Sequence, residues 1–468
     1  MNAYKNTYCN PMKVENYPMG YEAPDHRSLA DPSVIYYEGK WYMYPSYGMA
    51  YVSEDFITWK HHPIQPVDIG YAPTVVVHKG KIYLCANGDS AMLYVADNPL
   101  GPFEQVGHMC YPNGEKVDGP DKMLFSDDDG RLYLYFTQNF TDKESGIAIY
   151  GVELDGDNPT KALTDPIHLI GFHPEHTWEC FGARSQHKGL GWIEGAWMVK
   201  INGRYYLTYS GSGTAFGTYA TGAYYSDEGP LSGFVYQKRN PICSRNYGLT
   251  RGGGHGSIVE GPNGTYWSFY TIPISYSFKF ERRIGMDPIE VDQNGEIMMV
   301  TNTDTPQWAP GAVADPYHNG ATDLVPLTIN MPVYASGSAP GRDPLYAVDE
   351  NLQSWWQPAA EDDEKSLTVD LRGSYLASAM RIIWRDVNIN IAEGRCPGAF
   401  QYKVEVSTDE KNWVTVVDKT ANTTDYAVDY ETFETVPANF VRLTVTGTPE
   451  GIEAGVIDFT VFGKYPQE

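Results

Sequence analysis

Basic residues are scarce in this sequence relative to acidic ones. The 468 residues include 34 Lys and Arg against 59 Asp and Glu, a formal net charge of −25 at pH 7. Nucleic acids and anionic membranes are bound through basic faces, so the charge balance argues against both as partners. A run of 18 apolar residues is also lacking, and we therefore expect no membrane-spanning helix.

Cysteine is scarce as well, and its spacing shows no metal or redox motif. Six cysteines are spread along the chain without a CxxC pair. Scattered single cysteines are typical of reduced thiols in a cytoplasmic protein. The first 20 residues have no apolar segment of the kind found in signal peptides. We therefore expect a cytoplasmic protein, or a secreted one if a signal segment has been removed from the chain.

What the sequence does contain is a repeated hairpin pattern. A short apolar run reaches a turn glycine and an aromatic-rich strand follows, as in DPSVIYYEGKWYMY at residues 31–44. Glycine between alternating apolar strands is typical of a β-hairpin. The five copies begin at Asp31, Ala72, Asp121, Glu194 and His255, and their turn glycines are Gly39, Gly80, Gly130, Gly203 and Gly264.

The spacing of the copies favours a β-propeller. They begin 41, 49, 73 and 61 residues apart, and a unit of that size with several strands is typical of a propeller blade. Five blades would occupy about residues 20–300. Repeated hairpins also occur in sandwiches and barrels, so these folds remain alternatives on the pattern alone.

The residues that open the five copies are candidates for a functional site. Inner strands line the channel of a propeller, so equivalent first residues would form one ring at its mouth. Four of the five are ionisable and three of these are carboxylates. Strand ends often carry Asp or Glu for solubility alone, but four ionisable residues at matching positions favour a shared pocket. Crowded carboxylates repel each other, which suits groups whose pKa values must diverge.

Carboxylates with separated pKa values point to glycoside hydrolysis. One acid protonates the leaving oxygen, and a second carboxylate acts on water or on the anomeric carbon. A third carboxylate close to the acid would raise the pKa of that acid by like-charge repulsion.

Residues 20–300 resemble glycoside hydrolase family 43, a family of inverting enzymes with a five-bladed β-propeller. The resemblance is carried first by ADPSVIYY (30–37), GPDKMLFSDDDG (119–130) and IEGAWMVKINGRYYL (193–207). It extends to YAPTVVVHKGKIYL (71–84), GGGHGSIVEGPNGTYW (252–267) and ERRIGMDPIEVDQNG (281–295). By this resemblance, Asp31 is the expected general base and Glu194 the expected general acid. Asp121 is expected to raise the pKa of the acid and to orient it.

The resemblance also implies further contacts in the channel. His255 matches a central histidine that reaches a metal or ordered waters, and a hydrogen-bonded structural role is the equal alternative. Arg282 is expected to contact substrate, with Arg283 as the alternative. No cofactor is required on this interpretation, although a structural calcium ion in the channel remains an option.

The chain departs from the family pattern at several positions. Tyr71 stands for the usual Trp, Thr74 for the usual Asp, and Lys122 where a proline is common. The three acids are kept, but these changes put the substrate contacts in doubt. A long segment at residues 171–195 adds Trp178 and Trp192, which we predict either to stack on sugar together with Tyr71 or to anchor the loop.

A second domain follows the propeller pattern. Residues 301–323 are rich in Pro, Gly and polar residues, which is typical of a linker, and short strands follow them. We predict a propeller at residues 1–310, a linker at 311–324 and a β-sandwich at 325–468. YAVDENLQSWWQP (346–358), SLTVDL (366–371) and YKVEVSTDEKNW (402–413) resemble discoidin-like modules of the factor V/VIII type C, related to carbohydrate-binding module family 32. Sugar binding and docking to the catalytic domain are both open for this domain.

These observations predict an exo-acting, inverting glycoside hydrolase that removes terminal sugars from plant-type oligosaccharides or polysaccharide side chains. An α-L-arabinofuranosidase or a β-D-xylosidase is the first expectation. A galactose- or galactofuranose-releasing relative is the alternative within the enzymes. A carbohydrate-binding propeller without catalysis is the alternative outside them, and the presence of all three acids argues against it.

Overall fold

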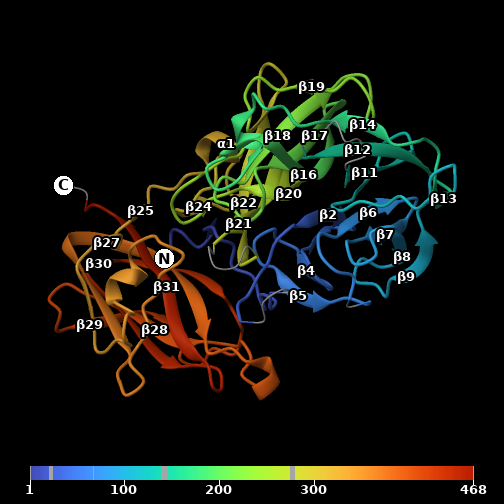
Figure 1. The fold of residues 1–468 in the computed structure, drawn as a ribbon. Helices are drawn as coiled ribbons and strands as arrows, with labels where there is room; N and C mark the ends of the chain where they lie inside the picture. Colours follow the sequence, from blue (N-terminus) through green and yellow to red (C-terminus); the bar gives the residue numbers. More distant parts are fainter. Residues whose placement is uncertain (1, 21–24, 67, 139–145, 275–279, 467–468) are drawn as a thin grey trace. The chain divides into compact units, whose positions relative to one another are not determined.

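The computed structural model describes residues 2–20, 25–66, 68–138, 146–274 and 280–466. Strands make up 49% of it and helix 4%, so the chain is all-β as predicted. The chain forms two compact units (Figure 1). The propeller unit comprises residues 29–273 and 282–302, and the sandwich unit comprises residues 1–28, 274–281 and 303–468.

The propeller unit is built from antiparallel blades. Blade 1 contains β2 (Ser33–Tyr37), β3 (Lys40–Tyr44), β4 (Met49–Ser53) and β5 (Lys60–Pro63). Blade 2 contains β6 (Thr74–His78), β7 (Lys81–Cys85), β8 (Met92–Ala96) and β9 (Glu104–His108). Blade 5 contains β20 (Gly254–Glu260), β21 (Tyr266–Pro273), β22 (Arg282–Val291) and β23 (Ile297–Met299).

Blades 3 and 4 share one sheet. Blade 3 contains β10 (Met123–Ser126), β11 (Leu132–Gln138) and β12 (Gly146–Asp155), with β13 (Asn158–Ala162) and β14 (Ile167–Ile170) paired to β12. Blade 4 contains β16 (His187–Ile201), β17 (Arg204–Gly211), β18 (Ala220–Ser226) and β19 (Val235–Tyr236), with β15 (Cys180–Phe181) paired to β16. The two blades are joined because β12 and β16 extend far enough to pair in parallel, at Gly146↔Gly191 and Ile147↔Trp192.

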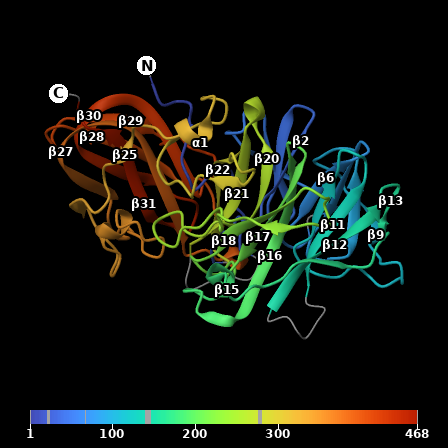
Figure 2. The ribbon, with the colours of Figure 1, turned by 90° about the horizontal axis from the view of Figure 1, so that it is seen from above.

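The five inner strands close into a ring. They contact each other in the order β2, β6, β10, β16, β20 and back to β2, which confirms the five-bladed propeller. Four of these inner strands, β2, β6, β16 and β20, are labelled in Figure 2. Apolar side chains fill the space between blades. Tyr44 and Val75 belong to the cluster between blades 1 and 2, and Cys85 and Leu124 to the cluster between blades 2 and 3.

Turn chemistry explains why the repeated glycines lie where they do. In three blades a two-residue turn joins the first two strands, at Glu38–Gly39, Lys79–Gly80 and Asn202–Gly203. Both residues of each turn have positive φ, between 48° and 85°. Such turns match the twist of the paired strands and favour glycine at the second position. Short 3₁₀ turns complete the unit at Thr177–Glu179 and Pro262–Gly264.

The sandwich unit is dominated by three long strands. The strand order is β25 (Val325–Pro326), β31 (Glu453–Lys464), β27 (Ser366–Val387), β30 (Val428–Gly447), β28 (Gln401–Ser407) and β29 (Trp413–Asp418), with β26 (Val333–Ala335) paired to β27. Register shifts in β27, such as the one between Asp370 and Tyr375, bend the long strands. This is the discoidin-like β-sandwich that the sequence predicted. Short elements complete it: β1 (Thr7–Tyr8) paired to β24 (Gln307–Trp308), α1 (Pro316–Asn319), and 3₁₀ turns at Pro344–Ala347 and Ile391–Glu393.

The N-terminal segment belongs to the sandwich unit, whereas the sequence placed residues 1–310 in one domain. Buried charges explain the difference. The Arg27 guanidinium makes four hydrogen bonds of 2.6–2.7 Å to Asp386 and Asp425. The Arg381 guanidinium is fully buried and donates to the carbonyl oxygens of Asn10 (2.9 Å) and Asp304 (2.7 Å). Segments far apart in the sequence are thus parts of one folded unit.

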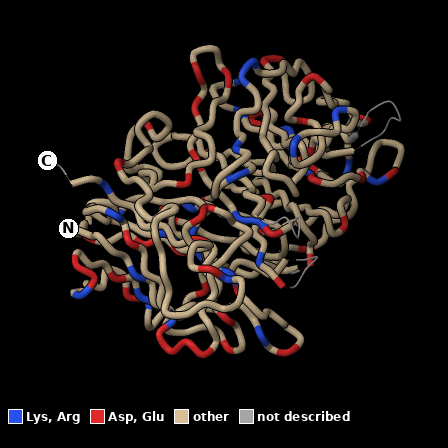
Figure 3. Tube along the Cα trace, turned by 60° about the vertical axis from the view of Figure 1, so that its left-hand side comes forward, with Lys and Arg blue, Asp and Glu red and all other residues tan. Residues whose placement is uncertain are grey.

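Acidic and basic residues are distributed over both units (Figure 3). In the described part of the chain, no helix has the length and apolarity needed to cross a membrane. The six cysteines all lie among the described residues and are free thiols.

Candidate active site

Each inner strand of the propeller is associated with one residue in the left-handed backbone region, which lies before the strand in blades 1 to 3 and at a register shift within β16 and β20. This residue stands two positions before the first regularly paired residue of the strand. The five residues are Asp31 (φ 55°), Ala72 (46°), Asp121 (54°), Gly195 (60°) and His255 (39°). The equivalent of Asp31 in blade 4 is therefore Gly195, and Glu194 precedes it by one residue.

Left-handed backbone is unfavourable for residues other than glycine, so these kinks need support. In four blades the N–H of the kinked residue donates to a side chain of the preceding blade. In its own blade, that side chain belongs to the segment of the second strand, two residues after the residue that pairs with the first regularly paired residue of the inner strand. In blade 1, for example, Ser33 pairs with Tyr44, and the side chain is that of Ser46. The four bonds join Asp31 to Thr271 Oγ1 (3.0 Å), Ala72 to Ser46 Oγ (3.1 Å), Asp121 to Asn87 Oδ1 (3.1 Å) and His255 to Ser210 Oγ (2.6 Å).

The Asp31 carboxyl is buried and surrounded by groups that favour its charged form. Ser46 Oγ donates to Oδ2 (2.6 Å), Arg282 Nη1 to Oδ1 (3.2 Å), and His255 Nδ1 lies 3.4 Å from Oδ1. Burial acts to raise the pKa of Asp31, but Arg282, His255 and the Ser46 hydroxyl together hold that pKa below its usual value. A carboxylate that stays ionised in a buried site is suited to accept a proton from water.

The Glu194 carboxyl is in the opposite electrostatic situation. Burial, and then the nearby Asp121 carboxylate, raise the pKa of Glu194 to about 7. Its oxygens accept hydrogen bonds from Tyr219 Oη (2.8 Å to Oε1) and Trp192 Nε1 (2.7 Å to Oε2). A carboxylic acid that keeps its proton near neutral pH is suited to act as a general acid.

The Asp121 carboxyl interacts with both of the other acids. Burial, and less strongly the charge of Asp31, raise the pKa of Asp121. Hydrogen bonds from Asn87 Nδ2 (3.0 Å) and from the backbone N–H of Gly195 act in the opposite direction. The structure thus brings the three predicted acids into one buried, electrically coupled group.

His255 and Arg282 lie at Asp31, on the side of the proposed base. The His255 ring also covers Gly195, where a Cβ atom would stand 2.8 Å from the ring. Arg282 faces the carboxylate, whereas the neighbouring Arg283 is buried and donates to the carbonyl oxygen of Arg282 (3.0 Å). Arg282 is therefore the better candidate of the two for contact with a substrate.

A metal in the channel would depend on His255 and on water. Among the residues that the structure describes, no three or more His, Cys, Asp or Glu side chains are grouped to hold a metal ion. Nδ1 of His255 already faces the Asp31 carboxylate. The predicted calcium ion stays a prediction, and no chemical step below depends on it.

The three predicted aromatic contacts take different positions. Tyr71 is 46% exposed and close enough to Asp121 for that charge, after burial, to raise the pKa of the Tyr71 phenol. Trp192 donates to Glu194 and contacts Phe181 (5.5 Å between ring centroids). Trp178 instead packs over the strands of blade 4, with its Nε1 donating to Tyr236 Oη (3.1 Å). Tyr71 and Trp192 thus adjoin the acids, and Trp178 anchors its loop.

Sequence reasoning missed the residues that hold the acids in place. Ser46 and Asn87 follow the opening residues of their repeats by 15 positions, and Ser210 and Thr271 occupy the same structural position in blades 4 and 5. A polar residue at a fixed distance was thus a readable signal. Tyr219 carries no such signal, because its contact with Glu194 depends on how the loop after β17 folds.

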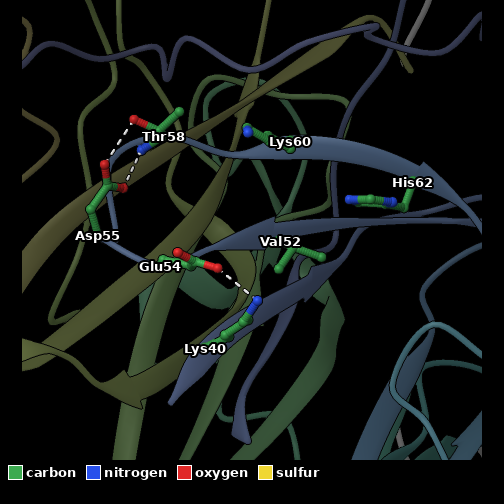
Figure 4. A pocket seen from close by; sticks show the side chains of 7 residues that line it. All are labelled: Lys40, Val52, Glu54, Asp55, Thr58, Lys60 and His62. Atoms are coloured by element: carbon green, nitrogen blue, oxygen red, sulfur yellow. Dashed lines mark hydrogen bonds and ion pairs between the residues drawn. The ribbon is translucent and has the colours of Figure 1, made fainter. Parts of the chain in front are cut away.

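A surface cavity of about 400 Å³ lies elsewhere, on the outer strands of blade 1 (Figure 4). Its acidic residues, Glu54 and Asp55, are exposed, and a hydrogen bond from Lys40 lowers the pKa of Glu54. None of the three channel acids lines it, so it is not the candidate active site. Its lining residues are Lys40, Val52, Glu54, Asp55, Thr58, Lys60 and His62.

Comparison with known proteins agrees with this geometry. The family described as Glycosyl hydrolases family 43 matches residues 21–297, more than half of the chain. The family described as NedA-like, galactose-binding domain matches residues 346–443.

Curated relatives and a solved structure are similar to the same part of the chain. "Beta-D-galactofuranosidase xynD" of Aspergillus niger is 26% identical over 313 residues, which cover 58% of this chain and 83% of that protein. "Xylosidase/arabinosidase 43A" of Humicola insolens is 27% identical over 333 residues, covering 58% of this chain and 95% of that protein. The crystal structure of a thermostable family-43 glycoside hydrolase matches the fold with a TM-score of 0.53 at 22% identity, covering 65% of this chain and 99% of that one.

Proposed function

Because the chain belongs to glycosyl hydrolases family 43 and is a glycoside hydrolase, we propose that it removes terminal sugars from oligosaccharides by an exo-acting, inverting reaction. The observation that carries the mechanism is the opposite electrostatic setting of two buried acids. The pKa of Asp31 is held low, and that of Glu194 is raised to about 7.

In the proposed reaction, Asp31 accepts a proton from a water molecule while that water attacks the anomeric carbon. Glu194 donates its proton to the glycosidic oxygen as the bond between that oxygen and the anomeric carbon breaks. The water stands on the face of the sugar opposite the leaving group, so the product has inverted configuration. Asp121 keeps the proton on Glu194 until the substrate arrives.

We propose α-L-arabinofuranosides or β-D-xylosides as substrates. The support is that the Humicola insolens relative is named a xylosidase/arabinosidase. A second candidate is a galactofuranoside, because the Aspergillus niger relative is named a β-D-galactofuranosidase. The galactose-binding family match of residues 346–443 supports a sugar-binding role for the sandwich unit.

The exo action is supported by an aromatic wall beside Glu194. Phe181 contacts Trp192 and, at 5.1 Å between ring centroids, Phe216. The 3₁₀ turn directly before the strand of Phe181 is anchored by the buried Glu179 carboxylate, which accepts from Tyr209 Oη (2.6 Å). A rigid wall on one side of the acids favours a pocket for a chain end over an open groove.

A panel of nitrophenyl glycosides tests the proposal: arabinofuranoside, xyloside, galactofuranoside and galactopyranoside. We expect release of nitrophenol from at least one, and Glu194→Gln should lose hydrolysis of the same glycoside when that glycoside carries a poorer leaving group. Proton NMR of the first-formed sugar then reports its anomeric configuration. No hydrolysis of any glycoside, or a product with retained configuration, would contradict the proposal.

A further inference from the structure

Asn87 holds Asp121 at two points. Its Oδ1 accepts the backbone N–H of Asp121 (3.1 Å), and its Nδ2 donates to Oδ1 of the Asp121 carboxyl (3.0 Å). In blades 4 and 5 the same structural position is occupied by Ser210 and Thr271, whose hydroxyls accept only the backbone bond from the next blade. Ser46, at this position in blade 1, donates to the Asp31 carboxyl of its own blade, whereas the Asn87 amide donates to the carboxyl of the same residue whose backbone N–H it accepts.

The orientation of the Asn87 amide is determined by its first bond. A backbone N–H can only donate, so the carbonyl oxygen of Asn87 must face the Asp121 backbone. The NH₂ group must then face the carboxyl, and it too can only donate. Asn87 therefore offers a hydrogen bond to an ionised Asp121 and no acceptor to a protonated one.

A second donor reaches Asp121 from blade 4. The backbone N–H of Gly195 donates to the Asp121 carboxyl, whereas the equivalent N–H in every other blade donates to a second-strand side chain: Thr271, Ser46, Asn87 or Ser210. Thr137 is the blade-3 residue at the position that Asn87 holds in blade 2. Its buried hydroxyl has no hydrogen-bond partner among the described residues. An unpaired buried hydroxyl is costly, so the redirection of the Gly195 amide is a specific feature of this site.

The hydrogen bonds at Glu194 are less restrictive. The Tyr219 hydroxyl donates to Oε1 of the charged form, and it can rotate to accept a hydrogen bond from the O–H of the carboxylic acid form. Trp192 Nε1 can only donate to Glu194, so Glu194 has one donor-only partner and one adaptable partner. By contrast, both Asn87 and the Gly195 amide can only donate to Asp121. When two interacting buried carboxyls share one proton, the carboxyl whose partners are all donor-only is the better place for the charge. That carboxyl is Asp121, and the proton remains on Glu194.

We propose that Asn87 is a positioning residue which, together with the Gly195 amide, keeps Asp121 ionised and so leaves the shared proton on Glu194. The inference rests on the proposed function, in which Glu194 is the general acid. Six titratable or charged groups face Asp121 and take part in its electrostatics: Asp31, Tyr71, Lys122, Glu194, Tyr219 and His255.

The variant Asn87→Ser separates the two bonds of Asn87. Serine keeps an acceptor for the backbone N–H, as Ser46 and Ser210 do in other blades, but it replaces the amide donor to the carboxyl by the hydrogen of a shorter hydroxyl, which weakens that bond. The hydrogen bond from Asn87 lowers the pKa of Asp121, so weakening that bond raises this pKa. Since the proposal requires an ionised Asp121 for activity, we expect the acid limb of the kcat/KM profile to move to higher pH by up to about one unit while the alkaline limb stays in place.

Two further variants separate this effect from general damage. Thr137→Val changes the corresponding position in blade 3 and removes only a hydroxyl without a partner, so both limbs should stay in place. Tyr219→Phe removes a donor to Glu194 and should move the alkaline limb upward instead. If Asn87→Ser lowers kcat/KM at every pH without moving either limb, Asn87 has only a structural role, and the proposal is overturned.

A measurement without substrate makes the test independent of the proposed function. In protein labelled with [4-¹³C]aspartate, the Asp121 carboxyl resonance is assigned by its loss in Asp121→Asn and followed with pH. Its midpoint should be higher in Asn87→Ser than in the wild type, and an equal midpoint overturns the proposal. If Asn87→Ser does not fold, Asn87→Ala, which removes both bonds without adding a charge, should raise the midpoint as well. If the wild type cleaves no glycoside, the proposed function fails, and the NMR midpoint still decides the role of Asn87.

Discussion

At the scale of single residues, burial and neighbouring charge give chemically similar carboxyls different tasks. Asp31 and Glu194 are both buried, yet cations and a hydroxyl lower the pKa of one, and an adjacent carboxylate contributes to raising that of the other. The pH dependence of the enzyme should follow from this difference. Glu194 must be protonated to act, so activity should be present below its pKa and should fall as pH rises through about 7.

Glu194→Gln removes the proton donor and keeps the shape of the side chain. We expect kcat for substrates with poor leaving groups to fall by about 10²–10⁴-fold, with a much smaller loss for activated aryl glycosides. The alkaline limb near pH 7 should disappear with the carboxyl group. Asp31→Asn is the matched control, because it should impair both substrate classes alike. Equal losses for both classes in Glu194→Gln would remove Glu194 from the role of acid.

Asp121→Asn should act on the proton of a neighbour. The Asp121 charge helps to raise the pKa of Glu194, so an uncharged amide lets that pKa fall. We expect the alkaline limb of the kcat/KM profile to move to lower pH, measured with an activated substrate. An alkaline limb at unchanged pH would show that burial alone raises the pKa of Glu194.

At the scale of elements, a kink at each inner strand presents the reacting groups at the channel. The sequence pattern predicted the hairpins because turn glycines and alternating apolar residues are local signals. The pattern placed Glu194 at the position equivalent to Asp31, whereas the backbone places Gly195 there. The register shift between Glu194 and Trp197 that causes this difference is not visible in the pattern. The hydrogen bond between Tyr219 and Glu194 was unpredictable for a related reason, since it joins a loop to a strand through folding alone.

Gly195 should tolerate no side chain, for two separable reasons. Its φ is +60°, and a Cβ atom would stand 2.8 Å from the His255 ring. Gly195→Ala should therefore displace His255 and the amide that holds Asp121, and kcat should fall at least about 10-fold, as for a misplaced positioning group. Gly203→Ala is the control, since Gly203 has φ +83° but open space around its Cβ position. It should lower thermal stability slightly and leave kcat unchanged; equal kinetic losses would contradict the steric argument.

At the scale of the whole molecule, the division into units does not follow the order of the chain. Residues 1–28 and 303–324 join the C-terminal strands in the sandwich unit, although composition suggested a linker at 311–324. Charged residues that reach their partners across hundreds of positions leave no local pattern in a sequence. Arg27 lies 359 residues from Asp386, and the Arg27 side chain is 1% exposed. The N-terminal segment is therefore part of the fold of the sandwich unit.

Arg27→Met tests this dependence in the full chain. It leaves the Asp386 and Asp425 carboxylates, which are 4% and 14% exposed, without their shared cation. Breaking a buried ion pair by removing one partner costs about 3–5 kcal/mol, so we expect a clear fall in the unfolding temperature of the sandwich unit. Lys81→Met, which breaks the exposed pair with Asp97, is the control and should leave thermal unfolding nearly unchanged. Calorimetry of both variants gives the comparison. An unfolding profile of Arg27→Met that overlays the control would mean that the N-terminal segment contributes little to the stability of the sandwich unit.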